Sequence, residues 1–281
     1  MNLRLVSARE PIGQEPHVDV RPFISLRSVS LIYDADADAG SLTLDRVSMG
    51  IARGEFVAVV GPSGCGKSTL MKLVTGLLPA TSGEVIVDGN LVRRPIKGVG
   101  MAFQNATLLP WRTTLKNVLL PLEIVEPFKS ERRHKRAAHV ARAQSMLDAV
   151  GLGSFGAKFP WQLSGGMQQR ANLCRALVHE PKLLMLDEPF AALDAFTREE
   201  LWGVMQALWL QRRFSAILVT HDLREAVYLA DRVIVISKKP GRVIFERRVD
   251  LPRPRTIEGS FEPYFIDLVH ELRSKIIEAR S

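Results

Sequence analysis

Short apolar runs alternate with amphipathic helical patterns along most of the chain. The runs Phe56–Val60, Leu183–Leu186 and Val233–Ile236 are continuous and short, which is typical of strands buried on both faces. Helical periodicity marks Ala195–Arg212 and Leu223–Leu229 between such runs. Because buried strands alternate with helices, the pattern predicts an α/β fold with a mostly parallel sheet.

Other patterns flank or interrupt this alternation. Strand-like segments at Ile24–Tyr33 and Leu42–Ile51 are separated by the acidic, turn-forming stretch Asp34–Ser41. From about Thr114 to Val178 the pattern is helical, and it includes an alanine- and arginine-rich run, Glu131–Val150. A helical block inserted into an α/β layer predicts a second lobe of the molecule.

These patterns divide the chain into three parts. Residues 1–22 carry prolines at positions 11, 16 and 22 and are expected to form a loose leader. Residues 23–248 are expected to form the main domain, with the helical lobe at about 105–178. Residues 249–281 are expected to form a basic, proline-bearing linker and a C-terminal helix at Glu262–Ala279.

Composition and charge narrow the possible partners. The chain has 281 residues, 46% of them hydrophobic, and a net charge of +8. That excess favours an anionic partner, which could be nucleic acid, a phosphate-rich ligand or a membrane surface. The basic stretches 129–136 and 242–255 carry much of it, although a solvated helix or hairpin face is the commoner reason for such stretches. No apolar run approaches the roughly 18–20 residues that cross a bilayer, and a secretory signal pattern is absent, so a cytoplasmic location is expected.

The segment after the first apolar run matches a phosphate-binding loop. Gly61-Pro-Ser-Gly-Cys-Gly-Lys-Ser68 fits G-x-x-x-x-G-K-[ST] and stands between a predicted strand and a helix at about Lys67–Leu77. Its glycines allow backbone N–H groups to wrap phosphate oxygens, and the helix start adds a favourable dipole. Lys67 is expected to contact the β- and γ-phosphates, and the Ser68 hydroxyl is expected to bind Mg²⁺. GTPases, kinases of small molecules and recombinases share this loop, so it indicates the ligand class only.

Two acidic residues and a histidine follow other apolar runs. Asp187 and Glu188 end the run Leu183–Leu186, where nucleotide-binding folds place a carboxylate that faces Mg²⁺. Glu188 is suited to polarise an attacking water as a general base. His221 follows the run Ala216–Thr220, which is expected to neighbour the first strand. A structural role and a catalytic role are both open for His221.

A second phosphate-seeking helix start lies at Ser164-Gly-Gly, 97 residues after Lys67. Its exposed N–H groups, its hydroxyl and the positive end of the helix dipole favour a phosphate. The apolar face of this helix is formed by Met167, Ala171, Cys174 and Val178. Two copies of the chain facing each other head to tail would let each offer this segment to the nucleotide held by the other.

These motifs, in this order, resemble the ATP-binding-cassette (ABC) family over residues 24–248. The resemblance implies a P-loop NTPase core with an N-terminal antiparallel β subdomain and an inserted helical subdomain. It implies ATP hydrolysis, with ATP and Mg²⁺ as cofactors. The ATP-binding residues that it implies are Tyr33, Gly61, Pro62, Ser63, Gly64, Cys65, Gly66, Lys67, Ser68 and Thr69, with Ser164, Gly165, Gly166 and Met167 bound to the ATP of the opposing subunit.

The same resemblance assigns further roles. It makes Gln104 the residue that touches Mg²⁺ and the attacking water while sensing the membrane partner. It places Asp194 in the D-loop and makes Tyr33 the aromatic that stacks on adenine, the alternative being a tyrosine of the core or of an edge strand. The implied catalytic residues are Glu188, His221, Gln104 and Lys67, and the implied Mg²⁺ ligands are Ser68, Gln104 and Asp187.

A narrower resemblance, to the nitrate/sulfonate/taurine importers of bacteria, follows from Leu108-Leu-Pro-Trp-Arg-Thr113. It implies a pair of cassettes, identical or not, bound to integral-membrane permease subunits at the cytoplasmic face of the inner membrane. A solute-binding protein would act through the permease. Pro110 and Trp111 would receive the coupling helix of the permease, although Trp111 could instead be a local core anchor. The solute stays open among nitrate, sulfonates, taurine and pyrimidine-like compounds.

Two other functions explain fewer features. A nucleic-acid-linked ABC ATPase, for repair or translation, suits the net charge of +8. Such proteins generally carry a coiled-coil insertion, a zinc module or two cassettes, and this chain shows one set of motifs and no cysteine pair. A small-molecule kinase would leave Ser164–Met167 without a role. No nucleic-acid partner is therefore expected.

The two cysteines should differ in reactivity. Neither Cys65 nor Cys174 belongs to a disulfide or metal-ligand spacing, which fits a reducing compartment. Cys65 stands beside Lys67 at a helix start, so its thiolate is expected to be favoured and reachable. Cys174 lies on the apolar face of its helix and is expected to be a small buried hydrophobe.

Overall fold

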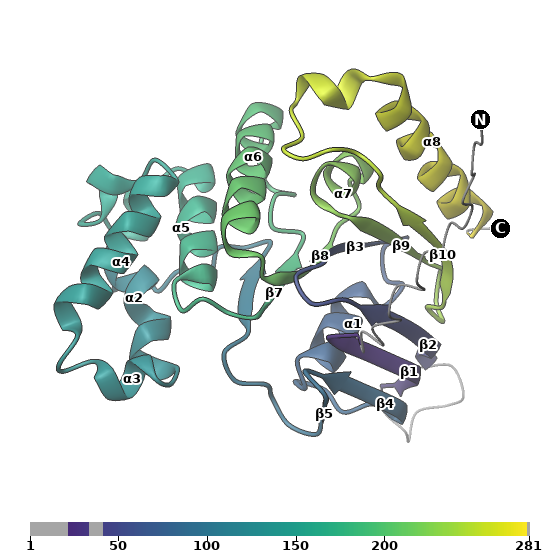
Figure 1. The fold of residues 1–281 in the computed structure, drawn as a ribbon, viewed down its shortest axis with the longest axis horizontal. Coiled ribbons are helices and arrows are strands. Elements are labelled where there is room, and N and C mark those ends of the chain that lie inside the picture. The colour runs from purple at the N-terminus through teal and green to yellow at the C-terminus, as the bar shows by residue number, and fades with distance from the viewer. Residues whose placement is uncertain (1–21, 34–41, 280–281) are drawn as a thin grey trace, which may run out of the picture.

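Two β-sheets and a set of helices make up the part of the chain that the structure describes (Figure 1). The structure is a computed structural model, and it describes residues 22–33 and 42–279. The predicted leader, apart from Pro22, and the acidic stretch 34–41 lie outside the described residues. The predicted α/β fold with its mostly parallel sheet is confirmed.

The smaller sheet is antiparallel, in the order β2-β1-β4-β5. Its strands are β1 (Ile24–Ile32), β2 (Leu42–Ile51), β4 (Ser82–Val87) and β5 (Asn90–Leu91). Ile24 of β1 pairs with Ile51 on one side and with Val87 on the other. The inward side chains of this sheet share a core with the buried residues of helix α1 (Lys67–Val74). This packing holds the start of α1 against the sheet.

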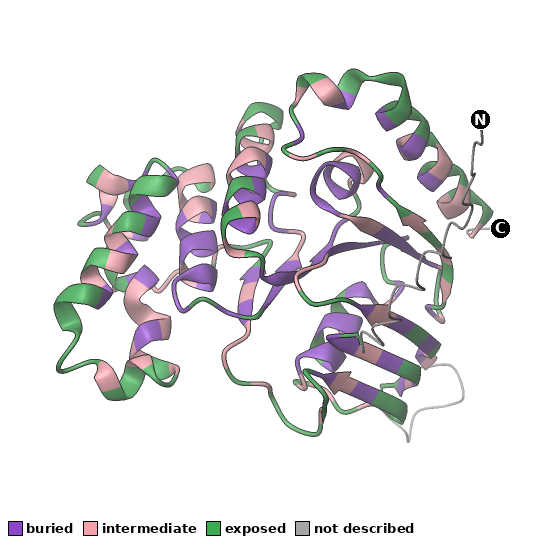
Figure 2. Cartoon of the chain, in the orientation of Figure 1, coloured by how far each residue is buried: buried purple, intermediate pink, exposed green. Residues whose placement is uncertain are grey.

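The larger sheet forms the centre of the molecule, in the order β10-β9-β3-β8-β7-β6. Its parallel strands are β3 (Phe56–Val60), β6 (Gly100–Phe103), β7 (Leu183–Asp187), β8 (Ser215–Val219) and β9 (Arg232–Ile236). Every residue of β3 and β8 is buried, and Figure 2 shows this central region as continuously buried. Alternate residues of β3 serve different cores: Ala58 packs on one side, Val57 and Val59 on the other.

The edge strand β10 (Val243–Arg248) was missed in the sequence analysis. It pairs antiparallel with β9, so that Phe245 lies opposite Val235. None of its six residues is buried. An edge strand without buried residues has no apolar periodicity, and the residues of β10 belong to the basic stretch 242–255. No pattern in the sequence therefore indicated the backbone pairing.

Helices α6 (Ala195–Arg212) and α7 (Leu223–Leu229) have the predicted bounds. The helical lobe lies beyond the β6 edge of the central sheet (Figure 1). Its elements are α2 (Thr114–Ile124), α3 (Phe128–Glu131), α4 (Arg136–Ala149) and α5 (Gly165–Leu177), with 3₁₀ turns at Gly153–Phe155 and Pro160–Gln162. The helix predicted from Glu131 begins only at Arg136, because a run of basic residues places like charges on one turn.

The C-terminal segment packs against the central sheet and α7. It contains a 3₁₀ turn, η3 (Glu258–Phe261), and helix α8 (Pro263–Glu278), whose buried residues join the core of the central sheet. Arg255 in the preceding linker is buried. Its guanidinium donates hydrogen bonds of 2.7–3.1 Å to the carbonyl oxygens of Val227, Tyr228, Ala230 and Val249. A boundary at residue 248 stays a prediction.

Arg255→Met should destabilise the fold by about 3 kcal/mol, because buried carbonyl oxygens at the end of α7 lose their donors. Equilibrium unfolding in urea measures the change. Arg273→Met is the matched control, since Arg273 is exposed on α8, and it should leave the midpoint nearly unchanged. Equal midpoints for the Arg255 variant and the parent chain would show that the carbonyls find other partners.

Candidate functional site

Glycine is required at two positions of the loop between β3 and α1. At Gly61 a Cβ atom would stand 2.5 Å from the carbonyl oxygen of Ile236. Gly66 has a φ of +99°, and a Cβ there would stand 2.7 Å from Cδ2 of Leu44. Both positions therefore exclude larger residues for reasons of space, and the second also for backbone conformation. The loop is held between the smaller sheet and the end of β9.

Lys67, the first residue of α1, is buried within this loop. Its ammonium donates hydrogen bonds of 2.9 Å to the carbonyl oxygens of Gly61 and Pro62. The first N–H groups of a helix have no partner within the helix, so the start of α1 offers donors to an anion beside this cation. The geometry suits the phosphate groups of a nucleotide.

Ser68 and Asp187 meet at the carboxyl end of the central sheet, where the Ser68 hydroxyl donates a 3.0 Å hydrogen bond to Asp187 Oδ1. Burial raises the pKa of Asp187, the bond from Ser68 lowers it, and the neighbouring Glu188 raises it further. A hydroxyl and a carboxylate are hard oxygen ligands, which Mg²⁺ prefers, and a cation would offset the cost of burying the Asp187 charge. These residues fit Mg²⁺ when phosphate oxygens and water complete its coordination. Among the described residues no group of three or more His, Cys, Asp or Glu could hold a metal ion alone.

Glu188 and His221 lie side by side at the same sheet edge. Nδ1 of His221 is 3.1 Å from Oε2 of Glu188. The strands that deliver them, β7 and β8, are parallel neighbours, as expected, with Asp187 opposite Val219. Glu188 has a φ of +47°, and its N–H donates to the Val219 carbonyl oxygen at 2.8 Å. A non-glycine residue in this left-handed region carries backbone strain, which here aims the Glu188 side chain.

Gln104 and Tyr33 lie near this constellation without completing it. Gln104 follows β6, whose last residue, Phe103, lies opposite Asp187. The Gln104 carbonyl accepts a hydrogen bond from Gln169 of α5. The Tyr33 hydroxyl is 3.3 Å from Oγ1 of Thr69. Metal ligation by Gln104 and adenine stacking by Tyr33 stay predictions.

The predicted signature segment, Ser164–Met167, lies at the start of α5. It is far along the sequence from the loop 61–69. Ser164 caps the helix, and its hydroxyl accepts a hydrogen bond of 3.3 Å from the Met167 N–H. Gly165 has open space around its Cα, whereas a Cβ at Gly166 would stand 2.6 Å from Cγ2 of Thr197. In the described part of the chain, no hydrogen bond joins this segment to residues 61–69. Its helix start is left open for a ligand from outside.

Arg198 joins two predicted functional segments, and sequence reasoning missed it. Asp194 caps α6 through a 3.0 Å bond from the Thr197 N–H to its carboxylate. One turn later, Arg198 donates a 2.9 Å bond to the Leu193 carbonyl oxygen and a 3.1 Å bond to Oδ2 of Asp222. Asp222 caps α7 directly after His221. No motif predicted this bridge, because Arg198 lies on a helix face where charged residues are common.

The expectation for Cys65 was wrong. Its side chain is 1% exposed, and burial raises the pKa of the thiol despite the nearby Lys67 ammonium. The thiol therefore packs inside the loop and is neither reachable nor biased towards the thiolate. Cys174 is buried as predicted, and burial raises its pKa to about 12.

The chain is similar to known proteins over most of its length. A family model described as ABC transporter matches residues 44–191. The aliphatic sulfonates import ATP-binding protein SsuB of Bacillus cereus is 38% identical over 237 residues, which are 84% of this chain and 87% of that protein. SsuB of Burkholderia ambifaria is 48% identical over 217 residues, 75% of this chain and 61% of that protein. A solved ATP-binding cassette, dimeric and in a post-hydrolysis state with ADP and Pi bound, is 31% identical and covers 82% of this chain and 100% of its own, with a TM-score of 0.68.

Arg198→Met should lower the turnover of ATP about tenfold while the KM for ATP stays within a factor of about two, because misplaced catalytic groups slow the chemistry more than binding. Steady-state hydrolysis assays measure both. Arg224→Met is the matched control: Arg224 also joins α7 to α6, through Glu199 at 3.5 Å, but does not touch Asp222 Oδ2 or Leu193. Equal turnover for the two variants would remove Arg198 from any positioning role.

Proposed function

The chain belongs to the ABC transporter family of ATPases, and we propose that it energises an importer for a small anionic or polar solute. ATP hydrolysis is supported by two side-chain contacts at one edge of the central sheet. Ser68 contacts Asp187, and Glu188 contacts His221. A role in import is supported by the relatives that are named as sulfonate import ATP-binding proteins.

The proposed chemistry assigns one task to each group. The phosphates of ATP bind in the loop 61–69, and Lys67 exchanges its carbonyl partners for β- and γ-phosphate oxygens. Mg²⁺ at Ser68 and Asp187 supplies charge that offsets the charge of the phosphates. Glu188 polarises the attacking water as a general base, and His221 holds the Glu188 carboxylate in place through their contact.

A head-to-tail dimer would complete the site. At the helix start, the N–H groups of Gly165 and Gly166 bond to no described residue, and the Met167 N–H bonds to the Ser164 hydroxyl. In the proposed dimer this segment binds the γ-phosphate of the ATP held by the other copy, which a helix start favours. The solved cassette at 31% identity is itself dimeric, which supports the arrangement. The partner cassette can be a second copy or a related chain.

The proposed permease contact lies at Trp111. This side chain is 72% exposed, so it is not a core anchor, the alternative left open above. An exposed tryptophan is suited to bury its ring in a partner surface. No helix in the described residues is long and apolar enough to cross a membrane. We propose that the chain acts on the cytoplasmic face of the inner membrane, bound to permease subunits that receive solute from a binding protein. Sulfonates are the favoured solute class.

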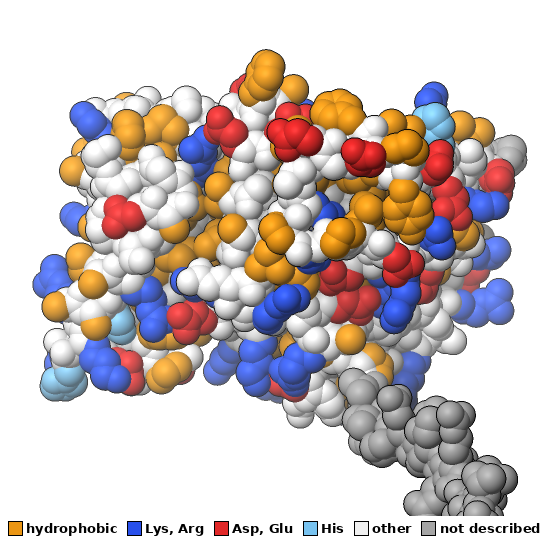
Figure 3. Space-filling view, turned by 45° about the horizontal axis from the view of Figure 1, so that its top comes forward, with side chains coloured by type: hydrophobic (Ala, Val, Ile, Leu, Met, Phe, Trp, Pro, Cys, Tyr) orange, Lys and Arg blue, Asp and Glu red, His pale blue; other side chains and the backbone are white. Residues whose placement is uncertain are grey.

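A nucleic-acid-linked function is the second candidate, and the net charge of +8 is the observation in its favour. Figure 3 shows basic side chains gathered along the lower margin of one face, with acidic side chains among them and over the rest of that face. Non-specific nucleic-acid binding depends on a continuous basic surface that neutralises several phosphates. The interrupted pattern favours the importer.

Glu188→Gln should cut ATP hydrolysis by about 10²–10⁴-fold, because the amide cannot accept a proton from water. ATP binding should survive, and ATP should then hold the variant as a dimer, since the bound nucleotide forms much of the interface. Phosphate release assays and light scattering with MgATP measure the two effects. Turnover near that of the parent chain would place the base elsewhere.

Hydrolysis by the chain should rise when it assembles with permease subunits in proteoliposomes together with a solute-loaded binding protein. Duplex DNA or RNA at about 0.15 M salt, where weak charge contacts are screened, should leave the rate unchanged. Trp111→Ser should lose the stimulation by the permease and keep the basal rate. Phe261→Ser, which alters another exposed aromatic residue at 65% exposure, should keep both. Stimulation by nucleic acid would overturn the ranking of the two functions.

A further inference from the structure

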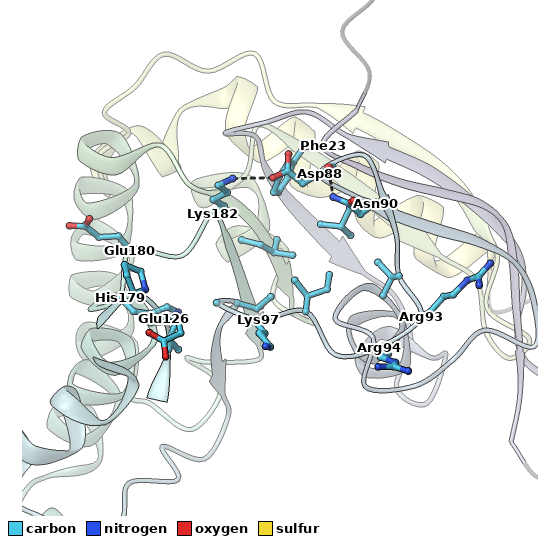
Figure 4. Close-up of a pocket in the computed structure, with 18 of the residues that line it drawn as sticks. Phe23, Asp88, Asn90, Arg93, Arg94, Lys97, Glu126, His179, Glu180 and Lys182 are labelled. Atoms are coloured by element: carbon cyan, nitrogen blue, oxygen red, sulfur yellow. Dashed lines mark hydrogen bonds and ion pairs between the residues drawn. The ribbon is translucent and has the colours of Figure 1, made fainter. Parts of the chain in front are cut away.

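A cavity of about 760 Å³ opens on the side of the central sheet away from the nucleotide loop (Figure 4). It adjoins Val99, just before β6, and Leu183, the first residue of β7, whereas Asp187 ends β7 at the other edge. Its remaining walls come from Phe23, the β4–β5 hairpin and the segment 92–98 after it, the junction of α2 and α3, and residues 179–182 after α5. Its volume lies within the range of about 300–1,000 Å³ that is typical of small-molecule sites.

The interior of this cavity is largely apolar. The side chains that form it include Val87, Leu91, Val92, Ile96, Val99 and Val125. Leu91 is 42% exposed at the rim. When the flat or branched apolar body of a ligand covers this wall, apolar surface is removed from water, which favours binding.

His179 is the one polar side chain of the wall that is more than nine-tenths buried, among the described residues. It is 7% exposed, and neither ring nitrogen forms a well-aligned hydrogen bond, although the backbone of Gly98 and Val99 lies close enough for weak ones. Burial lowers the pKa of His179, and these weak backbone bonds act in the opposite sense. A neutral imidazole offers one donor and one acceptor, and weak bonds do not fully offset the cost of burying them. Both ring nitrogens are shielded from solvent, so the ring turns towards the cavity when a ligand bonds it.

The rim carries positive charge that the described residues neutralise only in part. In Figure 4, Arg94 and Lys97 lie along the lower edge of the cavity, and Arg93 points away to solvent. Arg94 forms no hydrogen bond or ion pair with any described residue, and Lys97 only lies near Glu126.

The carboxylates of the lining are already engaged. Asp88 pairs with Lys182 at 3.1 Å and with Arg53, and Glu180 pairs with Arg142 at 3.2 Å. Glu126 accepts hydrogen bonds from the hydroxyl and N–H of Ser130. Those bonds leave the Glu126 charge in place near Lys97, but Arg94 and Lys97 together exceed it by one positive charge at the lower edge, which favours an anionic head group.

We propose that this cavity is a regulatory binding site for a small organic anion, with an apolar body inside and a sulfonate or carboxylate head at Arg94 and Lys97. The body covers the valine and leucine wall and places a polar edge against His179. Two elements link the site to catalysis. His179 follows α5, the helix that begins at Ser164, and Val99 precedes β6, the strand that ends just before Gln104. A bound ligand braces the helical lobe against the sheet and so slows ATP hydrolysis.

Binding is tested with a pair of fluorescent probes that differ in the anionic head: 8-anilinonaphthalene-1-sulfonate and the uncharged N-phenyl-1-naphthylamine. MgADP is kept saturating, so that the nucleotide loop is filled. The sulfonate should saturate one site, and the neutral probe should bind at least about tenfold more weakly, because it lacks the charge-assisted bonds at the rim. 1-Naphthoate should displace the sulfonate, whereas inorganic sulfate at the same concentration should not.

Variants locate the site. Arg94→Gln/Lys97→Gln should weaken the sulfonate probe about tenfold and leave the neutral probe unchanged. His179→Leu should weaken the sulfonate probe with little loss of thermal stability, since the ring makes only weak backbone contacts, with Gly98 and Val99. The control, Arg248→Gln/Arg273→Gln, removes the same charge from two exposed arginines elsewhere and should bind like the parent chain.

Two further readouts complete the test. The imidazole signals of His179, assigned in ¹H–¹⁵N spectra by their loss in His179→Leu, should shift on addition of 1-naphthalenesulfonate. The same compound should lower ATP turnover at saturating ATP in the parent chain and not in Arg94→Gln/Lys97→Gln. Equal binding by that double variant and its control, an unmoved His179 signal, or an unchanged turnover with the site filled would each overturn the proposal.

Discussion

Parallel pairing of the central strands is the constraint on which the site depends. Strands β3, β8 and β7 run in one direction and in register, with Ala216 of β8 opposite both Phe56 and Leu184. Their carboxyl ends therefore reach the same edge, and the loop at Gly61 and the segments at Asp187 and Thr220 all leave from it. The 3.0 Å bond between Ser68 and Asp187 spans 119 residues of sequence and exists only because β3 and β7 flank β8 and end at the same edge.

Rigid packing turns this shared edge into a positioned site. The strands are buried on both faces, so they cannot shift without opening two cores. Against that scaffold the chain sustains local strain at Glu188, a non-glycine residue with a φ of +47°. The Glu188 N–H is tied to the carbonyl oxygen of Val219, which sets the carboxylate beside His221. Strain of this kind persists only where the surroundings over-determine it.

The elements that carry the site also connect it to the rest of the molecule. Arg198 binds the carbonyl of Leu193 and the carboxylate of Asp222, so it joins the start of α6 to the start of α7. Helix α5 begins at Ser164 and ends near His179, and β6 begins at Gly100 and ends before Gln104. A helix and a strand transmit displacement along their axes, because each turn and each ladder bond is fixed. Helix α5 and strand β6 in this way connect the cavity edge of the central sheet to its nucleotide edge.

Local patterns were enough to predict most elements and the residue types of the site. The bounds of α6 and α7 were predicted to the residue, because caps and apolar periodicity are read within a few positions. The loop at Gly61–Ser68 and the pair Asp187–Glu188 were likewise identified, since their chemistry needs those residue types at fixed spacing. Where no local signal existed the predictions failed: β10 has no buried residue, and the basic run before Arg136 interrupts a helix that composition alone favours.

The sequence by itself determined the family, most of the strands and helices, and the residue types available at each motif, because these depend on neighbours along the chain. Only the tertiary structure decided which segments meet. It buried Cys65 inside the loop, where burial outweighs the Lys67 charge. It joined Arg198 to Asp222, exposed Trp111, and buried His179 in the wall of a cavity. The physical reason is that burial and long-range contacts depend on how whole surfaces pack, which no short window of sequence contains.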